Sequence, residues 1–203
     1  MKYLNRALAS LIFLFVLCVG SWFFAPWHTI ATYAIDKARM SAVRQGVYIS
    51  YDTLDTQGRF RPEFELKNVQ IEHAVAKADI ANVRLKILPL ESLRTLGLAA
   101  RLQFNNSAVT TITRNSFEAS GGEVLFMANK KSLQLLSVQI AGNLSATGNL
   151  TYDRTARKVA YSDLVFTVPD RLNAVLSSPI LGRFFESPKP GEWRIRYNAA
   201  QNR

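Results

Sequence analysis

Histidine and cysteine, which commonly act as acid–base groups, nucleophiles and metal ligands, are scarce in this sequence. Its 203 residues contain two histidines, His28 and His73, and one cysteine, Cys18. Neither histidine has a neighbour at metal-ligand spacing, and one cysteine supports neither an intramolecular disulfide nor a cysteine-based metal site. The sequence has no nucleophile elbow, phosphate-binding loop, dinucleotide fingerprint or EF-hand. We therefore predict no catalytic, metal or cofactor site.

The carboxylates offer one alternative, an envelope hydrolase. Acid–base catalysis needs titratable groups brought together, typically paired carboxylates or a histidine. Glu63 and Glu65, like Asp52 and Asp55, occur at spacings that place them on solvated strand faces and turns. A hydrolase would have to bring His73 together with an aspartate or glutamate from a distant part of the chain. We rank this alternative last.

A long apolar run dominates the N-terminus. Nineteen residues from Ala7 to Ala25 carry no charge, and as a helix they span roughly 28 Å, close to the thickness of a bilayer's hydrocarbon core. Lys2 and Arg6 precede the run, and positive charges favour the cytoplasmic side. We predict a single-pass membrane anchor, with the bulk of the chain on the side of the membrane opposite the cytoplasm. Its anchoring side chains are Leu11, Phe13, Leu14, Phe15, Leu17, Trp22, Phe23 and Trp27.

The competing interpretation is a cleaved secretory signal. Such signals have a shorter apolar core followed by a small-x-small cleavage site. Here Phe23 is too large for the third position before a cut after Ala25, and Pro26 follows directly. Lipoprotein processing would need a small residue before Cys18, where Leu17 stands. We favour the uncleaved anchor.

The charge of the chain indicates which partners to expect. The formal net charge is +10, and +8 remains without the two N-terminal positive residues. A basic surface can attract nucleic acid, anionic lipid headgroups or acidic proteins. Because the sequence has no basic stripe interleaved with aromatic residues, we expect no nucleic acid. The charge instead predicts the membrane and phospholipid or another anionic lipid as partners.

Beyond the anchor, hydrophobic periodicity predicts a short helix and then many strands. Residues 29–44 have helical spacing, and Gly46 is a plausible stop. From Val47 onward apolar and polar residues alternate, which is typical of half-buried antiparallel strands. We predict three parts: residues 1–27 as cytoplasmic tail and transmembrane anchor, 28–45 as a helical spacer, and 46–203 as one periplasmic β-rich domain.

The fold class is therefore mainly β, a curved antiparallel sheet of eight to ten strands, groove- or jelly-roll-like, with one short helical segment. We expect turns at residues 53–58 and at Gly121-Gly122, and a bulge or bend near Asn68. Residues 100–104 and 108–113 are predicted as separate strands, and residues 89–98 as a short helical turn or loop that presents Leu90, Leu93 and Leu96.

Alternation also predicts which side chains line the inner surface of the sheet, a candidate apolar groove. A slip of one residue would invert each strand, so these assignments depend on register. The candidates are Phe64, Leu66, Val83, Leu85, Leu102, Phe104, Leu164 and Phe166. A helical segment over residues 169–185 is expected to cover the sheet or to contact the membrane through Leu172, Leu176, Phe184 and Phe185.

The order of these parts resembles that of a known group of proteins. Residues 64–71 (FELKNVQI), residues 78–90 (ADIANVRLKILPL), the leucine-bearing turn that follows and the strand at residues 101–104 are similar to the repeating unit of AsmA-like bacterial envelope proteins. The C-terminal part, residues 164–197, is similar to the type II secretion system protein N (GspN)-like family within that group. The resemblance implies a curved sheet with an apolar inner surface. In the large relatives that surface is associated with lipid movement, and in the small ones with an accessory role in secretion. The resemblance therefore implies secretion-system or envelope proteins as further partners.

We accordingly expect a protein that is not an enzyme, an inner-membrane-anchored periplasmic accessory of type II secretion or envelope lipid handling that acts by binding. The first alternative is a purely structural interaction module that recruits a membrane complex and has a filled core. The envelope hydrolase is the second.

Overall fold

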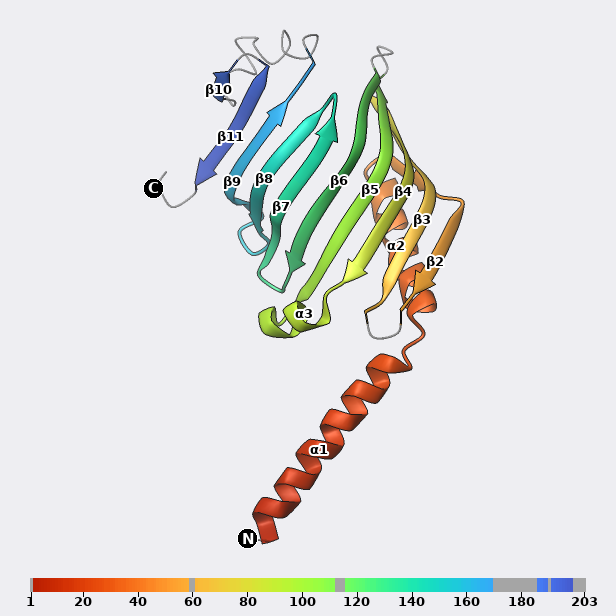
Figure 1. The fold of residues 1–203 in the computed structure, drawn as a ribbon, viewed down its shortest axis with the longest axis vertical. Helices are drawn as coiled ribbons and strands as arrows, with labels where there is room; N and C mark the ends of the chain where they lie inside the picture. Colours follow the sequence, from red (N-terminus) through yellow and green to blue (C-terminus); the bar gives the residue numbers. More distant parts are fainter. Residues whose placement is uncertain (1, 59–60, 112–115, 170–185, 190, 199–203) are drawn as a thin grey trace.

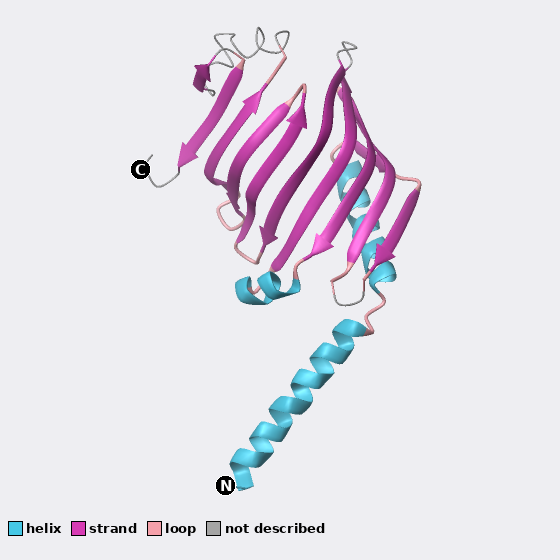
Figure 2. Ribbon diagram, in the orientation of Figure 1, coloured by secondary structure: helices cyan, strands magenta, loops and turns pink. Residues whose placement is uncertain are grey.

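The computed structural model describes residues 2–58, 61–111, 116–169, 186–189 and 191–198, with side chains described from Ser10 to Tyr197 within these ranges. These residues form three helices and eleven strands, whose arrangement is drawn in Figures 1 and 2. The helices are α1 (Lys2–Phe23), α2 (Trp27–Val43) and α3 (Pro89–Thr95). The strands are β1 (Val47–Ser50), β2 (Thr53–Gln57), β3 (Glu63–His73), β4 (Ala76–Ile87), β5 (Leu98–Thr111), β6 (Ser116–Ala128), β7 (Ser132–Gly142), β8 (Ser145–Asp153), β9 (Lys158–Thr167), β10 (Glu186–Lys189) and β11 (Glu192–Asn198).

All eleven strands belong to one antiparallel sheet. Its order is β1-β3-β4-β5-β6-β7-β8-β9-β11-β10, and β2 also pairs with β3 beside β1. From β3 to β9 each strand pairs with the next one in the sequence. The prediction of a mainly β, antiparallel sheet is confirmed. The jelly-roll-like arrangement is not found, since the described strands follow a meander order and a jelly roll needs Greek-key crossings.

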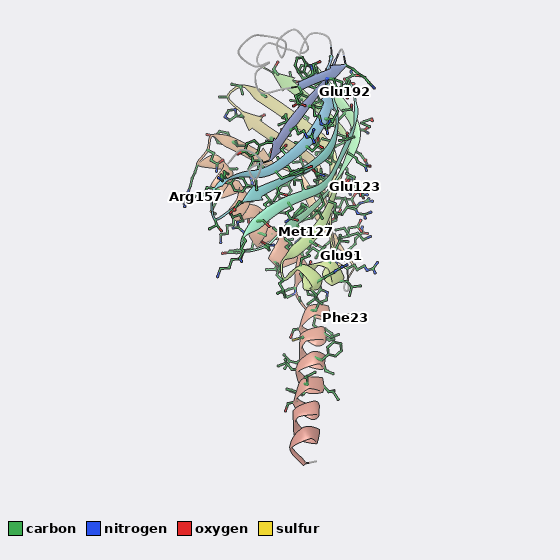
Figure 3. The ribbon with its side chains drawn as sticks, turned by 90° about the vertical axis from the view of Figure 1, so that its left-hand side faces the viewer. Phe23, Glu91, Glu123, Met127, Arg157 and Glu192 are labelled. Carbon is green, nitrogen blue, oxygen red and sulfur yellow. The ribbon has the colours of Figure 1, made fainter. Side chains whose placement is uncertain are left out.

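The sheet is strongly bent across its strands. Viewed edge-on in Figure 3, it curves away from the side on which Glu123 lies. Helix α2 lies on the opposite, concave side, behind β3 and β4 in Figure 1. The hydrogen-bond contact between His28 Nδ1 of α2 and Thr56 Oγ1 of β2, 3.4 Å, agrees with this placement. Thr56 is opposite Phe64, so the two side chains share the concave face.

The alternation of side chains reverses once along the sheet. Asn68 in β3 and Asn106 in β5 have positive φ angles, 52° and 48°, a conformation that asparagine tolerates better than most residues. Both stand opposite Ala81 of β4, between regular pairs on either side. The side chains of these neighbouring strands change face at the same level of the sheet, so the pairing register is kept. Beyond this point Val69, which is buried, continues the alternation one residue out of phase with Phe64. The predicted bulge or bend near Asn68 is confirmed.

Two turn predictions are wrong. Gly121 and Gly122 lie in the middle of β6 and pair with β5 and β7 on either side. Residues 53–57, predicted as a turn, form the edge strand β2, which pairs with residues 63–67. The predicted strands at 100–104 and 108–113 are joined in the single long strand β5, which is described to Thr111.

The N-terminal helices are separate. The break at residues 24–26 contains Pro26, which has no backbone N–H to donate to a continuing helix. Among the described residues, no single helix is long and apolar enough to cross a membrane, whereas residues 10–23 with 27–43 pass that test together as a pair bent by 69°. Core helices and signal sequences pass the same test. The helix predicted over residues 29–44 is confirmed as α2, and the one predicted over residues 169–185 lies outside the described residues.

Candidate functional site

Two adjacent rows of paired residues run across the concave side of the sheet. Each row takes one residue from every strand from β3 to β9 and one from β11. We call these sixteen residues the apolar face. The first row is Phe64, Leu85, Leu102, Val124, Val138, Gly148, Leu164 and Ile195. The second row is Leu66, Val83, Phe104, Gly122, Ile140, Ala146, Phe166 and Trp193.

The structure brings together all eight residues that alternation assigned to the inner surface. Each of the eight lies in one of the two rows, although Phe64 and Phe166, the first and last of them, are far apart in the sequence. The assignment missed the members in β6, β7 and β11, although Val124, Val138 and Ile195 also follow the alternating pattern. It missed Gly122 and Gly148 because a glycine has no side chain to show which face it occupies.

The apolar face is only partly covered. Phe64, Val138 and Trp193 are buried, whereas the other large side chains of the two rows are half-buried. Among the described residues only nine hydrophobic side chains are buried. A curved single sheet thus keeps a continuous apolar surface within reach of a ligand or partner.

Helix α2 covers one end of this surface. It contacts β1 and β2, and Ala31 is buried between them. Arg39 Nε donates a hydrogen bond to the carbonyl oxygen of Ile49 in β1, at 2.8 Å. Its guanidinium also lies 5.7 Å from the centre of the Tyr51 ring, within the range of a cation–π contact. These two contacts fasten α2 to β1 and to the residue that follows it.

A close approach of two strands makes the apolar face continuous at its centre. A Cβ atom on Gly122 would come within about 2.4 Å of the Phe104 ring and 3.0 Å of the Gln139 carbonyl oxygen. The ring therefore occupies the space that a side chain would take. This requirement explains a mid-strand glycine, which otherwise weakens a strand.

The convex side is polar and cross-linked by ion pairs. Glu63 contacts Arg84 at 3.1 Å and Lys86 at 3.3 Å. Glu65 accepts a hydrogen bond from Asn82 and contacts Arg84 at 3.4 Å, and these neighbours lower the pKa of its carboxyl group. The two carboxylates are half-buried beneath the more exposed side chains of Arg84 and Lys86, and such rows of paired charges indicate a polar, solvated surface. The two sides of the sheet thus differ sharply: one suits apolar ligands and the other faces water.

One ion pair on the convex side has near-ideal geometry. Arg194 Nε and Nη2 donate to the two carboxylate oxygens of Asp163 at 2.8 and 2.9 Å. These hydrogen bonds lower the pKa of Asp163. The pKa of Asp163 is therefore lower in the folded than in the unfolded state. The ion pair stabilises the fold fully at pH values above the unfolded pKa of about 3.9. This stabilisation is lost as the pH falls through the folded pKa.

We expect the substitution Arg194→Met to lower the free energy of unfolding at pH 7 and to leave it unchanged at a pH below the folded pKa of Asp163. Urea unfolding of the full chain in detergent, measured at a series of pH values, tests this. Arg196→Met is the comparison variant, because Arg196 stands opposite Asp163 and lowers its pKa through charge alone, without the bidentate contact, so a smaller loss is expected. An equal pH dependence in both variants would contradict the assignment.

The predicted chemistry-bearing residues are not brought together. His73 is exposed at the end of β3, opposite Val47 and Ala76. Cys18 is exposed on α1. Within the described part of the chain, no group of three or more histidine, cysteine or acidic side chains is placed to hold a metal ion.

The predicted anchor residues lie on and next to α1. Leu11, Phe13, Leu14, Phe15 and Leu17 are exposed on it. At its end, the rings of Trp22 and Trp27 pack edge to face with centroids 4.5 Å apart. Phe23 is exposed beside them. The predicted lid contacts Leu172, Leu176, Phe184 and Phe185 lie outside the described residues.

Comparison with known proteins identifies one family. Residues 4–197 match the family model described as "Type II secretion system protein GspN-like, Synergistales". Neither a curated protein nor a solved structure matches the chain.

Proposed function

Because the chain belongs to the GspN-like family of type II secretion system proteins of Synergistales, we propose that it is a non-catalytic accessory protein of type II secretion at the inner membrane. Residues 1–27 would be its cytoplasmic tail and transmembrane anchor, and residues 28–45 a helical spacer. Residues 46–203 would be a periplasmic domain. The exposed apolar side chains of α1 and the positive residues that precede it support this layout.

The domain would act by binding an apolar ligand, and the apolar face is the observation behind this proposal. Its sixteen positions are contributed by eight strands and form two unbroken rows. Lipid acyl chains suit such a surface, because each methylene group taken out of water contributes about 0.8 kcal/mol. The basic character of the chain, with a formal net charge of +10, favours phospholipids with anionic headgroups.

A position-specific cross-linking experiment tests this function in the full chain. Leu102 and Gln103 are neighbours in β5 and are equally half-buried, but Leu102 is on the apolar face and Gln103 pairs with Arg84 on the convex side. Each is replaced, in separate variants, by the photoreactive residue p-benzoylphenylalanine. Membranes that contain either variant are irradiated, and the adducts of the purified protein are identified by mass spectrometry.

We expect phospholipid adducts at position 102 that are roughly ten times more abundant than at position 103, because C–H bonds react only within contact distance. Protein adducts without lipid at position 102 would instead support the alternative, a structural interaction module that recruits a membrane complex. Equal lipid labelling at both positions would contradict a binding face, since the two side chains point to opposite sides.

A further inference from the structure

The turn between β4 and β5 presents leucines to solvent. In α3 and directly after it, Leu90, Leu93 and Leu96 are 63%, 73% and 89% exposed. They recur at every third position, so they project from one short segment. Leucine is usually buried in folded proteins, and a cluster of exposed leucines on one segment points to an interaction surface.

This turn is firmly held, so the exposure of its leucines does not come from an unstructured loop. Ser92 Oγ donates a hydrogen bond to the carbonyl oxygen of Leu88 at 2.8 Å and accepts one from the amide of Ala99 at 2.9 Å. The amide of Gly97 donates to the Ser92 carbonyl oxygen at 3.1 Å. The bond from Ala99 joins α3 to the start of β5, and the other two hold the first and last turns of the helix.

Leu96 has a left-handed backbone, with φ 49° and ψ 43°. That conformation is unfavourable for a residue with a Cβ atom, and for bulky residues it is uncommon enough to suggest a function. Here it ends the helix and extends the leucine side chain away from the protein, next to Gly97. A glycine at this position would satisfy the backbone at lower energy, so the leucine side chain itself has a use.

The position of α3 in the fold indicates what these leucines contact. Figure 1 shows α3 at the end of the sheet that faces α1, near the junction of α1 and α2. In Figure 3, Glu91 of α3 lies at the end of the domain next to Phe23, and Glu192 lies at the opposite end. At the same junction Phe24 is 80% exposed, and the rings of Trp22 and Trp27 pack edge to face. Indole rings favour the membrane–water interface.

We propose that Leu90, Leu93 and Leu96 insert into the lipid leaflet at which α1 leaves the membrane. The inference rests on the proposed membrane anchor, because it needs α1 to lie in the bilayer. The exposed Arg94 then lies at the height of the lipid headgroups, where a positive side chain is attracted to anionic lipid. Two attachments, α1 and α3, fix the orientation of the sheet relative to the bilayer, which one flexible attachment cannot do.

The test is a depth measurement on the full chain in vesicles of phosphatidylcholine and phosphatidylglycerol. Cys18→Ser removes the native thiol, and single cysteines at Leu93, Leu14 or Val75 receive the environment-sensitive fluorophore NBD. Val75 is the matched control, because it is exposed and apolar but precedes β4. The twelve residues of β4 separate it from α3, which corresponds to roughly 40 Å.

We expect NBD at positions 93 and 14 to emit at shorter wavelength and to lose at least half of its intensity when the lipids carry nitroxide groups on their acyl chains. NBD at position 75 should be unaffected. A quenched probe at position 14 with an unquenched probe at position 93 would overturn this inference and leave the proposed anchor intact. If neither probe is quenched, the anchor itself is wrong. A probe at position 93 that is shielded from water but not quenched would identify a protein contact, which also overturns the inference.

Discussion

Replacing Gly148 with alanine is expected to lower the free energy of unfolding by about 3 kcal/mol or more, the range of severe single substitutions. Gly148 lies in the first row of the apolar face with a φ of 136°, a region open almost only to glycine. An added Cβ would lie 2.1 Å from the carbonyl oxygen of Asp163 and 2.9 Å from the Cα of Leu164. Both atoms belong to the backbone of β9, so the strands would have to separate.

Urea unfolding of the full chain in detergent, followed by circular dichroism in the strand region, measures this effect. Gly46→Ala is the matched control. Gly46 also has a positive φ, 75°, but nothing lies within 4 Å of its added Cβ. We expect this variant to lose only about 1 kcal/mol, the cost of a left-handed alanine. Equal losses in the two variants would mean that the contact between β8 and β9 is looser than the structure indicates.

The double substitution Leu14→Arg and Leu17→Arg should release the protein from the membrane. An arginine near the centre of a membrane helix costs about 2.5–3.5 kcal/mol, whereas each large apolar residue contributes only about 0.3–0.6 kcal/mol to insertion. Two arginines therefore cancel the contribution of about ten apolar residues. The measurement is the fraction of the chain that stays with the membranes after alkaline carbonate extraction.

The same charges on α2 are the control for this experiment. Tyr33 and Met40 are 69% and 68% exposed on that helix, which we place outside the bilayer. The variant Tyr33→Arg with Met40→Arg should stay in the membrane fraction. Its release would show that α2 also lies in the bilayer. Retention of the α1 variant would refute the anchor.

Much of the sheet could be predicted from the sequence, because a half-buried antiparallel strand shows its own alternation. The change of phase between Leu66 and Val69 predicted the irregularity at Asn68, whose φ is 52°. The eight candidate inner residues fall in the two rows of the apolar face. Each of these predictions uses neighbours within one strand, and the alternation of a strand does not depend on its partners.

The failures involve residues whose role depends on another strand. Gly121-Gly122 has the composition of a tight turn, yet the pair is mid-strand because the Phe104 ring fills the space above Gly122. Residues 53–57 also resemble a turn, and they become an edge strand because β3 is long enough to pair with both β1 and β2. Local composition cannot distinguish these cases, since the deciding contact comes from a different part of the chain.

The sequence by itself determined the apolar N-terminal run, the alternating strands and the scarcity of catalytic groups, because these are properties of composition and local spacing. Only the tertiary structure decided that two rows align across eight strands, since register depends on pairing between distant segments. It also decided that α3 lies at the end of the sheet next to α1. That position follows from the number of residues in each strand and from the bend of the sheet, which no single stretch of sequence contains.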